Sequence, residues 1–498
     1  MNKLAKPLVN YPLAVLSALL LILAFPGWNY YWLAPFALTP LLYALANEPR
    51  PLQRFLLGYV TGNVYWFGVC YWIQFVLEVH GGMGRWGGWG TFLLFSLIKS
   101  LHLAVFALLA AVVISQWYAI PAVAALWTGI ERTHGDLGFA WLCLGNAGID
   151  LALPMRVAPW VGVYGLSFLF AMMATGAALV AMKRPRKELL WLLVVPALLL
   201  LPPLPAPESG DRTAVMVQPN VPEELDWTTE LADRLHQMLL GRSIGAALRA
   251  RADLIVWPEA PAPIYYYRDP VLQQRLARLA QLSKAWLLIG TVADTPRGEP
   301  LNSAVLIAPD GKPLDRYDKI NLVPFGEYVP EFFSWVNRIS QEAGDFVPGN
   351  RIVVFPFGER KLGTFICYES AFPQEVREFV KGGANLLVNI SNDGYFGHSG
   401  AREQHLEMVR MRAAENARWL LRATNNGITA NIDPAGRVVS RLPEFQEADG
   451  AFRYSLESGV TAYTRWGDWF AWGCWLIAFA ALFASQWPHY RARPIQLS

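Results

Sequence analysis

The sequence predicts a chain in two parts: a bundle of membrane-spanning helices and an α/β domain outside the membrane. Three observations lead to this prediction. The 498-residue chain is 54% hydrophobic and only 16% charged, which is too apolar for an ordinary soluble protein of this length. Long apolar runs fill most of residues 1–204. From 211 to 455, short β-like runs alternate with charged, helix-like segments.

The apolar runs predict about seven transmembrane helices in a membrane domain, residues 1–204, and one more helix at 466–490. A spanning helix needs about 20 residues, and some of the runs are only just long enough. The N-terminal run has the basic start of a signal peptide but lacks a small-x-small cleavage site, so we interpret it as a retained span. The later runs cover about 31–46, 55–79, 89–117, 118–133, 160–182, 189–204 and 469–487.

Basic residues in the short loops predict the orientation of these spans. Ten of them fall on one side and only three, Arg85, Arg132 and Arg156, on the other. By the positive-inside rule both termini are then cytoplasmic and residues 211–455 lie outside. The ten are Lys3, Lys6, Arg50, Arg54, Lys183, Arg184, Arg186, Lys187, Arg491 and Arg493.

Residues 211–455 follow a proline-rich linker and read as a second domain. Its apolar runs are typical of strands, and the helical stretches between them predict a layered α/β fold that buries its own core. The strand-like runs are TAVMVQ, DLIVW, WLLIGTV, NSAVLIAPDGK, IVVF, LGTFI, ANLLVNI and GITANIDPAG. The helical stretches lie near 227–250, 270–283, 373–381 and 401–421.

Composition also argues against several functions. The net charge of +3, with basic residues in short clusters, does not indicate nucleic-acid binding. The seven histidines are scattered, and no CxxC or HExxH spacing occurs, so we expect no metal. Cys70, Cys143 and Cys474 fall in apolar or interfacial stretches, which leaves Cys367 without a disulfide partner in the second domain.

Lys99 and His102 are ionisable residues within the fourth expected span. Their spacing of three places them on one helical face, and an ionisable residue in lipid is a candidate functional residue. The neighbouring runs supply no obvious acidic partner. We therefore favour snorkelling or a water-lined bundle interior over a catalytic role.

Three reactive side chains follow three of the expected strands. Glu259 comes after DLIVW, Lys319 after the hairpin arm that follows Asp310-Gly311, and Cys367 after LGTFI. A thiol with a pKa near ~8.5 is only a few per cent ionised at neutral pH, so a nucleophilic cysteine needs a base or a nearby cation. A carboxylate supplies the base, and an ammonium can also stabilise an oxyanion. Taken alone, Cys367 is more simply explained as a buried thiol, Glu259 as a helix cap and Lys319 as a surface charge.

Three motifs together resemble the nitrilase superfamily, whose members place a Glu-Lys-Cys triad on an α-β-β-α sandwich. The motifs are WPEAP, YDKINLVPFGEYVP and ICYE. With helical spans before and after such a domain, nearly the whole chain is similar to the apolipoprotein N-acyltransferases. The resemblance implies that Glu259 is the general base, Lys319 the oxyanion stabiliser and Cys367 the acylated nucleophile. It also implies supporting or substrate-binding roles, carried by Trp227, Glu327, Tyr368 and Glu369.

The resemblance implies a ping-pong acyl transfer in a bacterial inner membrane, with a periplasmic catalytic domain and no cofactor. The expected partners are a phospholipid acyl donor, a diacylglyceryl-modified apolipoprotein acceptor and membrane lipid, and we expect a monomer. Two alternatives stay open. One is a membrane-tethered amidase or nitrilase for a small soluble substrate, although a tether needs only one span. The other is a non-catalytic membrane scaffold, which an intact triad argues against.

Overall fold

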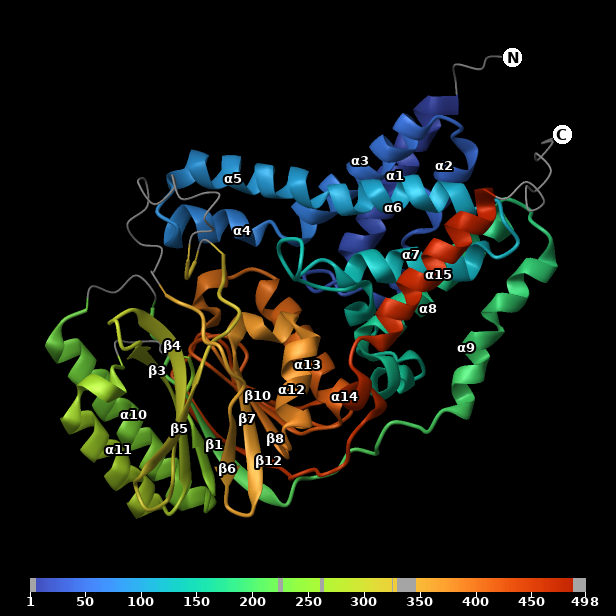
Figure 1. The fold of residues 1–498 in the computed structure, drawn as a ribbon. Helices are drawn as coiled ribbons and strands as arrows, with labels where there is room; N and C mark the ends of the chain where they lie inside the picture. Colours follow the sequence, from blue (N-terminus) through green and yellow to red (C-terminus); the bar gives the residue numbers. More distant parts are fainter. Residues whose placement is uncertain (1–5, 223–226, 260–263, 325, 329–345, 487–498) are drawn as a thin grey trace. The chain divides into compact units, whose positions relative to one another are not determined.

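The computed structural model describes residues 6–222, 227–259, 264–324, 326–328 and 346–486. The chain divides into two units, each described here by itself (Figure 1). The helical unit contains Met1–Tyr71, Trp89–Leu204 and Trp466–Ser498. The α/β unit contains Trp72–Gly88 and Pro205–Arg465.

The helical unit is a bundle of apolar helices. Three helical stretches within the described residues are long and apolar enough to cross a membrane: Gly84–Val113, Pro154–Ala181 and Trp469–Gln486. The number of spans before residue 204 stays a prediction. The helices are α1 (Lys6–Ala24), α2 (Thr39–Asn47), α3 (Pro51–Val69), α5 (Gly84–Lys99), α6 (Leu101–Val113), α7 (Ala119–Arg132), α8 (Ala158–Ala181), α9 (Val194–Ala197) and α15 (Trp469–Gln486).

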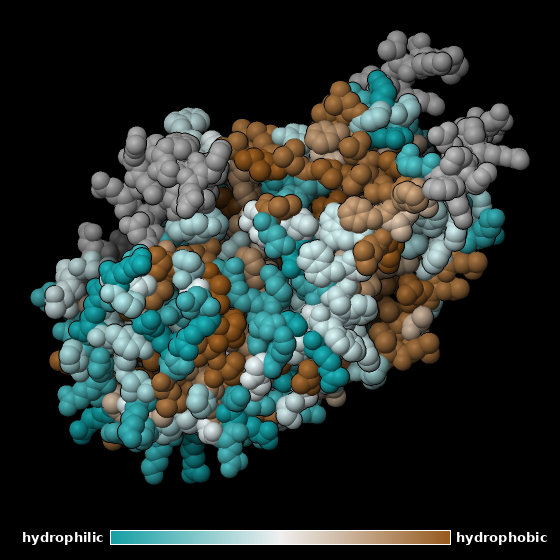
Figure 2. Space-filling model, viewed as in Figure 1, coloured by the Kyte–Doolittle hydropathy of each residue, from teal (hydrophilic) through white to brown (hydrophobic). Residues whose placement is uncertain are grey.

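Small residues let these helices approach closely, while large apolar side chains face outward. A Cβ on Gly58 in α3 would lie 2.4 Å from the Leu103 carbonyl oxygen of α6, so glycine permits this contact. On α15, Leu476, Phe479 and Phe483 are exposed. Figure 2 shows apolar surface over α5, α6 and α15. An exposed apolar helix surface is typical of helices that face lipid.

Lys99 is buried inside the helical bundle. Its Nζ donates to the carbonyl oxygens of Phe139 (2.8 Å) and His134 (3.4 Å) and lies 5.0 Å from the centre of the Trp66 ring. The His102 and His134 rings lie edge to face, 4.8 Å apart. Lys99 therefore does not snorkel: backbone carbonyls in the loop after α7 accept its hydrogen bonds.

Two six-stranded sheets form the centre of the α/β unit. The first has the order β12-β1-β2-β3-β4-β5, the second β11-β10-β9-β8-β7-β6. The strands of the first are β1 (Arg212–Gln218), β2 (Leu254–Val256), β3 (Trp286–Asp294), β4 (Pro300–Ile307), β5 (Pro313–Asp318) and β12 (Ala448–Tyr454). Those of the second are β6 (Val354–Phe357), β7 (Arg360–Ile366), β8 (Leu386–Ser391), β9 (Leu420–Thr424), β10 (Ala430–Ile432) and β11 (Val438–Arg441).

Each sheet is covered by helices on one side and packs against the other sheet on its other side (Figure 1). Helices α10 (Thr229–Ala250) and α11 (Pro270–Ser283) cover the first sheet. Helices α12 (Pro373–Lys381) and α13 (Ala401–Asn416) lie on the second. This arrangement confirms the predicted α-β-β-α sandwich. The parallel strands β1, β2 and β3, and likewise β7, β8 and β9, are almost fully buried, as central parallel strands usually are.

A short segment before α5 folds with the α/β unit. It contains α4 (Trp72–Phe75) and the π-helix η2 (Val76–His80). The Trp72 ring lies 4.9 Å from that of Phe396, and the His80 ring 4.6 Å from that of Tyr395. The apolar run expected at 55–79 is thus divided: α3 ends at Val69, and the rest packs on the turn that follows β8.

Candidate active site

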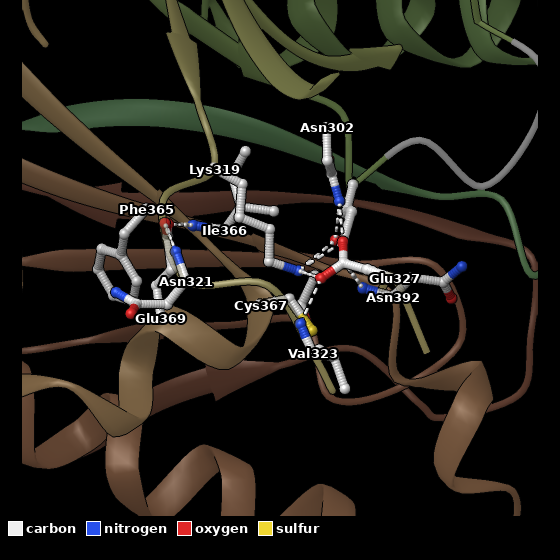
Figure 3. Close-up of polar contacts among 12 residues, drawn as sticks. Asn302, Lys319, Asn321, Val323, Glu327, Phe365, Ile366, Cys367, Glu369 and Asn392 are labelled. Carbon is white, nitrogen blue, oxygen red and sulfur yellow. Dashed lines mark hydrogen bonds and ion pairs between the residues drawn. The ribbon is translucent and has the colours of Figure 1, made fainter. Parts of the chain in front are cut away.

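The three predicted catalytic residues lie just beyond three strand ends and come together in one buried site, where Figure 3 labels Lys319 and Cys367 near each other. Glu259 follows β2, Lys319 follows β5 and Cys367 follows β7. Glu259 and Cys367 are each 7% exposed and Lys319 only 1%. The first two strands belong to one sheet and β7 to the other, so packing of the two sheets assembles the triad.

Lys319 pairs with two carboxylates. Its Nζ lies 3.2 Å from Glu259 Oε1, and 2.9 and 2.8 Å from the two carboxylate oxygens of Glu327. Burial lowers the pKa of Lys319, but Glu259 and Glu327 outweigh it and hold this pKa well above its usual value. Lys319 is therefore an ammonium at any physiological pH and can stabilise developing negative charge.

Asn302, on β4, is a site residue that the sequence did not reveal. Its Nδ2 donates to Glu259 Oε1 and to Glu327 Oε1, each at 2.7 Å. The Glu327 carboxylate also accepts from the backbone nitrogen of Val323 at 2.8 Å. Asn302 and Lys319 thus hold both acids, and Glu327 lies beside the triad, while its supporting role stays a prediction.

Cys367 adopts a backbone conformation that is unusual for a side chain with a Cβ. Its φ is +51°, in the left-handed region, where β7 turns into the 3₁₀ helix η9 (Cys367–Ala371). Burial, and then the charge of Glu259, raise the pKa of the thiol, while Lys319 opposes the increase. The resting thiol is therefore protonated, and it needs a base to become a nucleophile.

Glu369 does not face the reacting groups but joins two of their supporting segments. Its Oε2 accepts from the backbone nitrogen of Ile366 (2.7 Å), just before the nucleophile. Its Oε1 accepts from the backbone nitrogen of Ile320 (2.6 Å), just after Lys319, and from the Tyr317 hydroxyl (2.8 Å). Glu369 therefore holds the Cys367 turn and the Lys319 segment in a fixed relation.

Tyr368 and Trp227 are the two other predicted site residues. Tyr368 is buried, with its ring edge to face against Phe372 at 5.2 Å. Trp227 lies just before α10 and is 37% exposed. The described contacts do not join Trp227 to the triad, so its role in substrate binding stays a prediction.

The segment 389–400 begins as the buried end of a strand and continues as a partly buried turn. It contains the end of β8 and the 3₁₀ helix η10 (Asp393–Phe396), and residues 389–393 are buried. The backbone nitrogen of Asn392 donates to Glu259 Oε2 at 2.8 Å. The segment therefore reaches the site through a backbone hydrogen bond, and its Asn-Asp-Gly composition is typical of a turn.

Behind the nucleophile lies a second set of polar residues that sequence reasoning missed. His405, Asp393 and Arg422 are fully buried and lie together, with Arg422 donating hydrogen bonds to both of the others. They are separated by many residues in sequence, and no local pattern links them. Across the described residues no group of three His, Cys, Asp or Glu side chains is arranged to hold a metal ion.

Comparison with known proteins identifies both parts of the chain. Residues 213–449 match the carbon-nitrogen hydrolase family, and residues 17–176 match the apolipoprotein N-acyltransferase N-terminal domain. A Geobacter metallireducens protein named apolipoprotein N-acyltransferase is 36% identical over 97% of this chain and 96% of its own. Relatives of the same name from Azotobacter vinelandii (34%, over 88% and 89%) and Chlorobaculum tepidum (30%, over 93% and 94%) are also similar.

The site agrees with these matches. A buried thiol beside a carboxylate and an ammonium can form and break an acyl thioester, which is the chemistry of a cysteine-based acyl transfer. The N-terminal match accounts for the apolar helices that a soluble hydrolase does not need. The chain belongs to the apolipoprotein N-acyltransferase family, the membrane acyltransferases of lipoprotein maturation built on a nitrilase-type domain.

Proposed function

We propose that the protein transfers a fatty acyl chain from a glycerophospholipid to the N-terminal α-amine of a diacylglyceryl-cysteine on an apolipoprotein. The transfer has two half-reactions, and Cys367 carries the acyl group between them. The observation that carries this proposal is the contact of Lys319 Nζ with Glu259 and Glu327 beside a buried thiol, in a chain related end to end to named N-acyltransferases.

In the first half-reaction Glu259 takes the proton of the Cys367 thiol as the sulfur attacks the acyl carbonyl carbon. The Lys319 ammonium stabilises the oxyanion that forms on the carbonyl oxygen. The C–O ester bond then breaks, and the proton held by Glu259 passes to the leaving alkoxide. A lysophospholipid departs, and a thioester stays on Cys367.

In the second half-reaction the free α-amine of the acceptor attacks the thioester carbonyl. The C–N bond forms, the C–S bond breaks, and the amine proton passes through Glu259 to the departing sulfur. The thiol is regenerated and the product is an amide. The step runs downhill because an amide is more stable than a thioester, and the two lipids use one site in turn.

The test is the mass of purified protein exposed to phospholipid without acceptor. We expect an increase of one fatty-acyl group on the peptide that contains Cys367, removable by neutral hydroxylamine. A peptide bearing a diacylglyceryl-cysteine with a free amine should discharge it and gain an amide. Cys367→Ala should show neither event, and Glu259→Ala should not load because its thiol keeps its proton.

The same experiment separates the alternatives. A tethered amidase would clear a thioester with water and would not hold a long acyl chain in the absence of an amine. A non-catalytic scaffold would gain no mass from phospholipid. If the wild-type protein transfers acyl groups without ever showing a hydroxylamine-labile adduct, and its kinetics require both substrates bound together, the covalent mechanism is wrong.

A further inference from the structure

His405 lies on α13, 38 residues after the nucleophile, yet its ring contacts the nucleophile's own backbone. Its Nε2 lies 3.0 Å from the carbonyl oxygen of Cys367. A carbonyl oxygen can only accept, so Nε2 carries the hydrogen and donates it. The imidazole is fully buried, and the Phe396 ring lies edge to face against it at 5.7 Å. His405 thus reaches Cys367 with one fixed ring edge.

The other ring nitrogen is fixed by an ion pair. Nδ1 lies 3.1 Å from Arg422 Nη2 and 3.1 Å from Asp393 Oδ1, and the same Nη2 lies 2.8 and 2.9 Å from the two oxygens of Asp393. Burial, and then the Arg422 charge, lower the pKa of His405, although Asp393 opposes them. A neutral ring whose Nε2 carries the hydrogen accepts at Nδ1, and Arg422 supplies the donor.

This contact bears on the strained residue of the site. Cys367 has a φ of +51°, a conformation that is unfavourable for a residue with a Cβ and persists only when its surroundings hold it. On one side of Cys367, Glu369 accepts from the Ile366 nitrogen. On the other, His405 donates to the Cys367 carbonyl. The turn is therefore held before and after the nucleophile.

Orientation of this carbonyl has a chemical consequence. The peptide group is planar and trans, so the Cys367 C=O and the Tyr368 N–H point in opposite directions and turn together. When the carbonyl is held toward His405, the N–H is held away from it. The backbone N–H after a nucleophile on a strand-to-helix turn is a common oxyanion donor. Such a donor is effective only when it already points toward the position of the oxyanion before the reaction begins.

We propose that His405 is a positioning residue for acyl transfer: through its hydrogen bond to the Cys367 carbonyl it fixes the Cys367–Tyr368 peptide. The inference rests on the proposed function, in which Cys367 is acylated. His405 does not touch the substrate and takes no proton. Asp393 and Arg422 keep its ring oriented so that the donor faces the peptide.

Two amide variants test the hydrogen bond with matched chemistry. In His405→Gln the amide nitrogen reaches about as far as Nε2 and can still donate to the Cys367 carbonyl. In His405→Asn it reaches only about as far as Nδ1, on the side of Asp393. We expect His405→Gln to acylate Cys367 within about threefold of wild type. We expect His405→Asn to be slower by about 10- to 100-fold, below the full loss of an oxyanion donor, with KM for phospholipid little changed.

Alkylation of Cys367 by iodoacetamide supplies the second readout. Alkylation displaces iodide and forms no oxyanion, so a misaimed peptide should not slow it. Both variants should alkylate within about twofold of wild type, and their melting temperatures in detergent should agree within a few degrees. If His405→Asn fails to fold, His405→Phe, which keeps the ring packing against Phe396 and lacks the donor, takes its place.

Three results would overturn the inference. The first is an equal acylation rate in His405→Gln and His405→Asn. The second is a His405→Gln variant that acylates as slowly as a folded His405→Phe variant. The third is an alkylation rate that decreases in proportion to the acylation rate. Failure of the proposed function looks different, because wild-type protein would then gain no hydroxylamine-labile acyl group on Cys367 at all.

Discussion

Glu259 and Glu327 are held by the same two donors: the Oε1 atom of each lies 2.7 Å from Asn302 Nδ2 and within 3.2 Å of Lys319 Nζ. One amide nitrogen has two hydrogens, so each carboxylate receives one. Two carboxylates around a single ammonium leave one net negative charge beside the thiol. The proposed mechanism uses this arrangement: Glu259 takes the proton of Cys367, and the Lys319 ammonium meets the oxyanion.

Asn302→Asp should slow acylation of Cys367 by about 10- to 100-fold, because two hydrogen bonds to charged groups are lost and a third acid is added. The measurement is the rate of the hydroxylamine-labile mass increase. Asn431→Asp is a matched control, because this buried amide lies on β10 and bonds to Arg453 and Ser440 instead of the triad. An Asn302→Asp rate equal to that of the control would mean that Asn302 only stabilises the fold.

Lys319→Arg should be nearly as damaging as Lys319→Ala, and each should lower transfer by at least ~100-fold. Lys319 is 1% exposed between two carboxylates, so the wider guanidinium fork has no room to replace a compact ammonium. Acyl transfer to a diacylglyceryl peptide measures this. Near-normal transfer by the Arg variant would remove Lys319 from the catalytic role.

Glu375 should carry a proton at neutral pH. It contacts Tyr317 and Asn321, and burial, followed by the charge of Glu369, raises the pKa of Glu375 to about 10. In the unfolded chain this acid ionises near its ordinary value of 4.5. The stabilisation from the protonated acid is complete below pH 4.5 and decreases as the pH rises toward 10.

Glu375→Gln keeps the shape of a protonated acid and cannot ionise. Its melting temperature, relative to wild type, should therefore increase steadily between pH 5 and pH 9, with acylation activity retained at pH 7. Glu369→Gln serves as the contrast, since Glu369 accepts three backbone hydrogen bonds and should lose stability at every pH. Parallel melting curves for wild type and Glu375→Gln would contradict the assignment of the proton.

Gly145→Ala should destabilise the helical unit. A Cβ there would lie 2.2 Å from the Val163 carbonyl oxygen and 2.9 Å from the Leu166 Cβ, which leaves no space without a backbone shift. Gly473 on α15 has nothing within 4 Å of its Cβ position, so Gly473→Ala should be neutral or slightly stabilising. Melting temperatures in detergent compare the two, and equal values would mean that the bundle adjusts freely around Gly145.

Residues 211–455 should lie in the periplasm, with both termini in the cytoplasm. The asymmetry of ten to three basic residues in short loops motivates this, although Lys3, Arg491 and Arg493 fall outside the described residues. A reporter active only in the cytoplasm should be silent when fused near Ser209 and active at Arg186. The reverse pattern would invert the topology and remove the lipoprotein reaction from consideration.

Local patterns determined most of the α/β unit. Seven of the eight strand-like runs each contain one strand, and the eighth, NSAVLIAPDGK, spans β4 and the turn into β5. The helices also agree with expectation: both ends of α10, α11 and α12 lie within two residues of the predicted bounds. Three strands, β9, β11 and β12, lie outside the predicted runs and hairpin arm, and β9 shows why. The helix expected at 401–421 ends at Asn416, and Leu420–Thr424 is β9, a central strand of the second sheet. Its residues LLRAT suit either state, and only pairing with β8 and β10 selects the strand.

The three candidate reactive side chains could be located from the amino-acid sequence, because each follows a strand-like run or a hairpin arm, and strand ends are where such sheets place their chemistry. The tertiary structure alone decided which groups serve them. Asn302, His405 and Arg422 lie far from the triad in sequence, and their side chains look like ordinary buried polar residues. They come near the triad because strand pairing within each sheet, and packing of α13 on the second sheet, bring distant segments together, and hydrogen bonds over such separations leave no local periodicity in the chain.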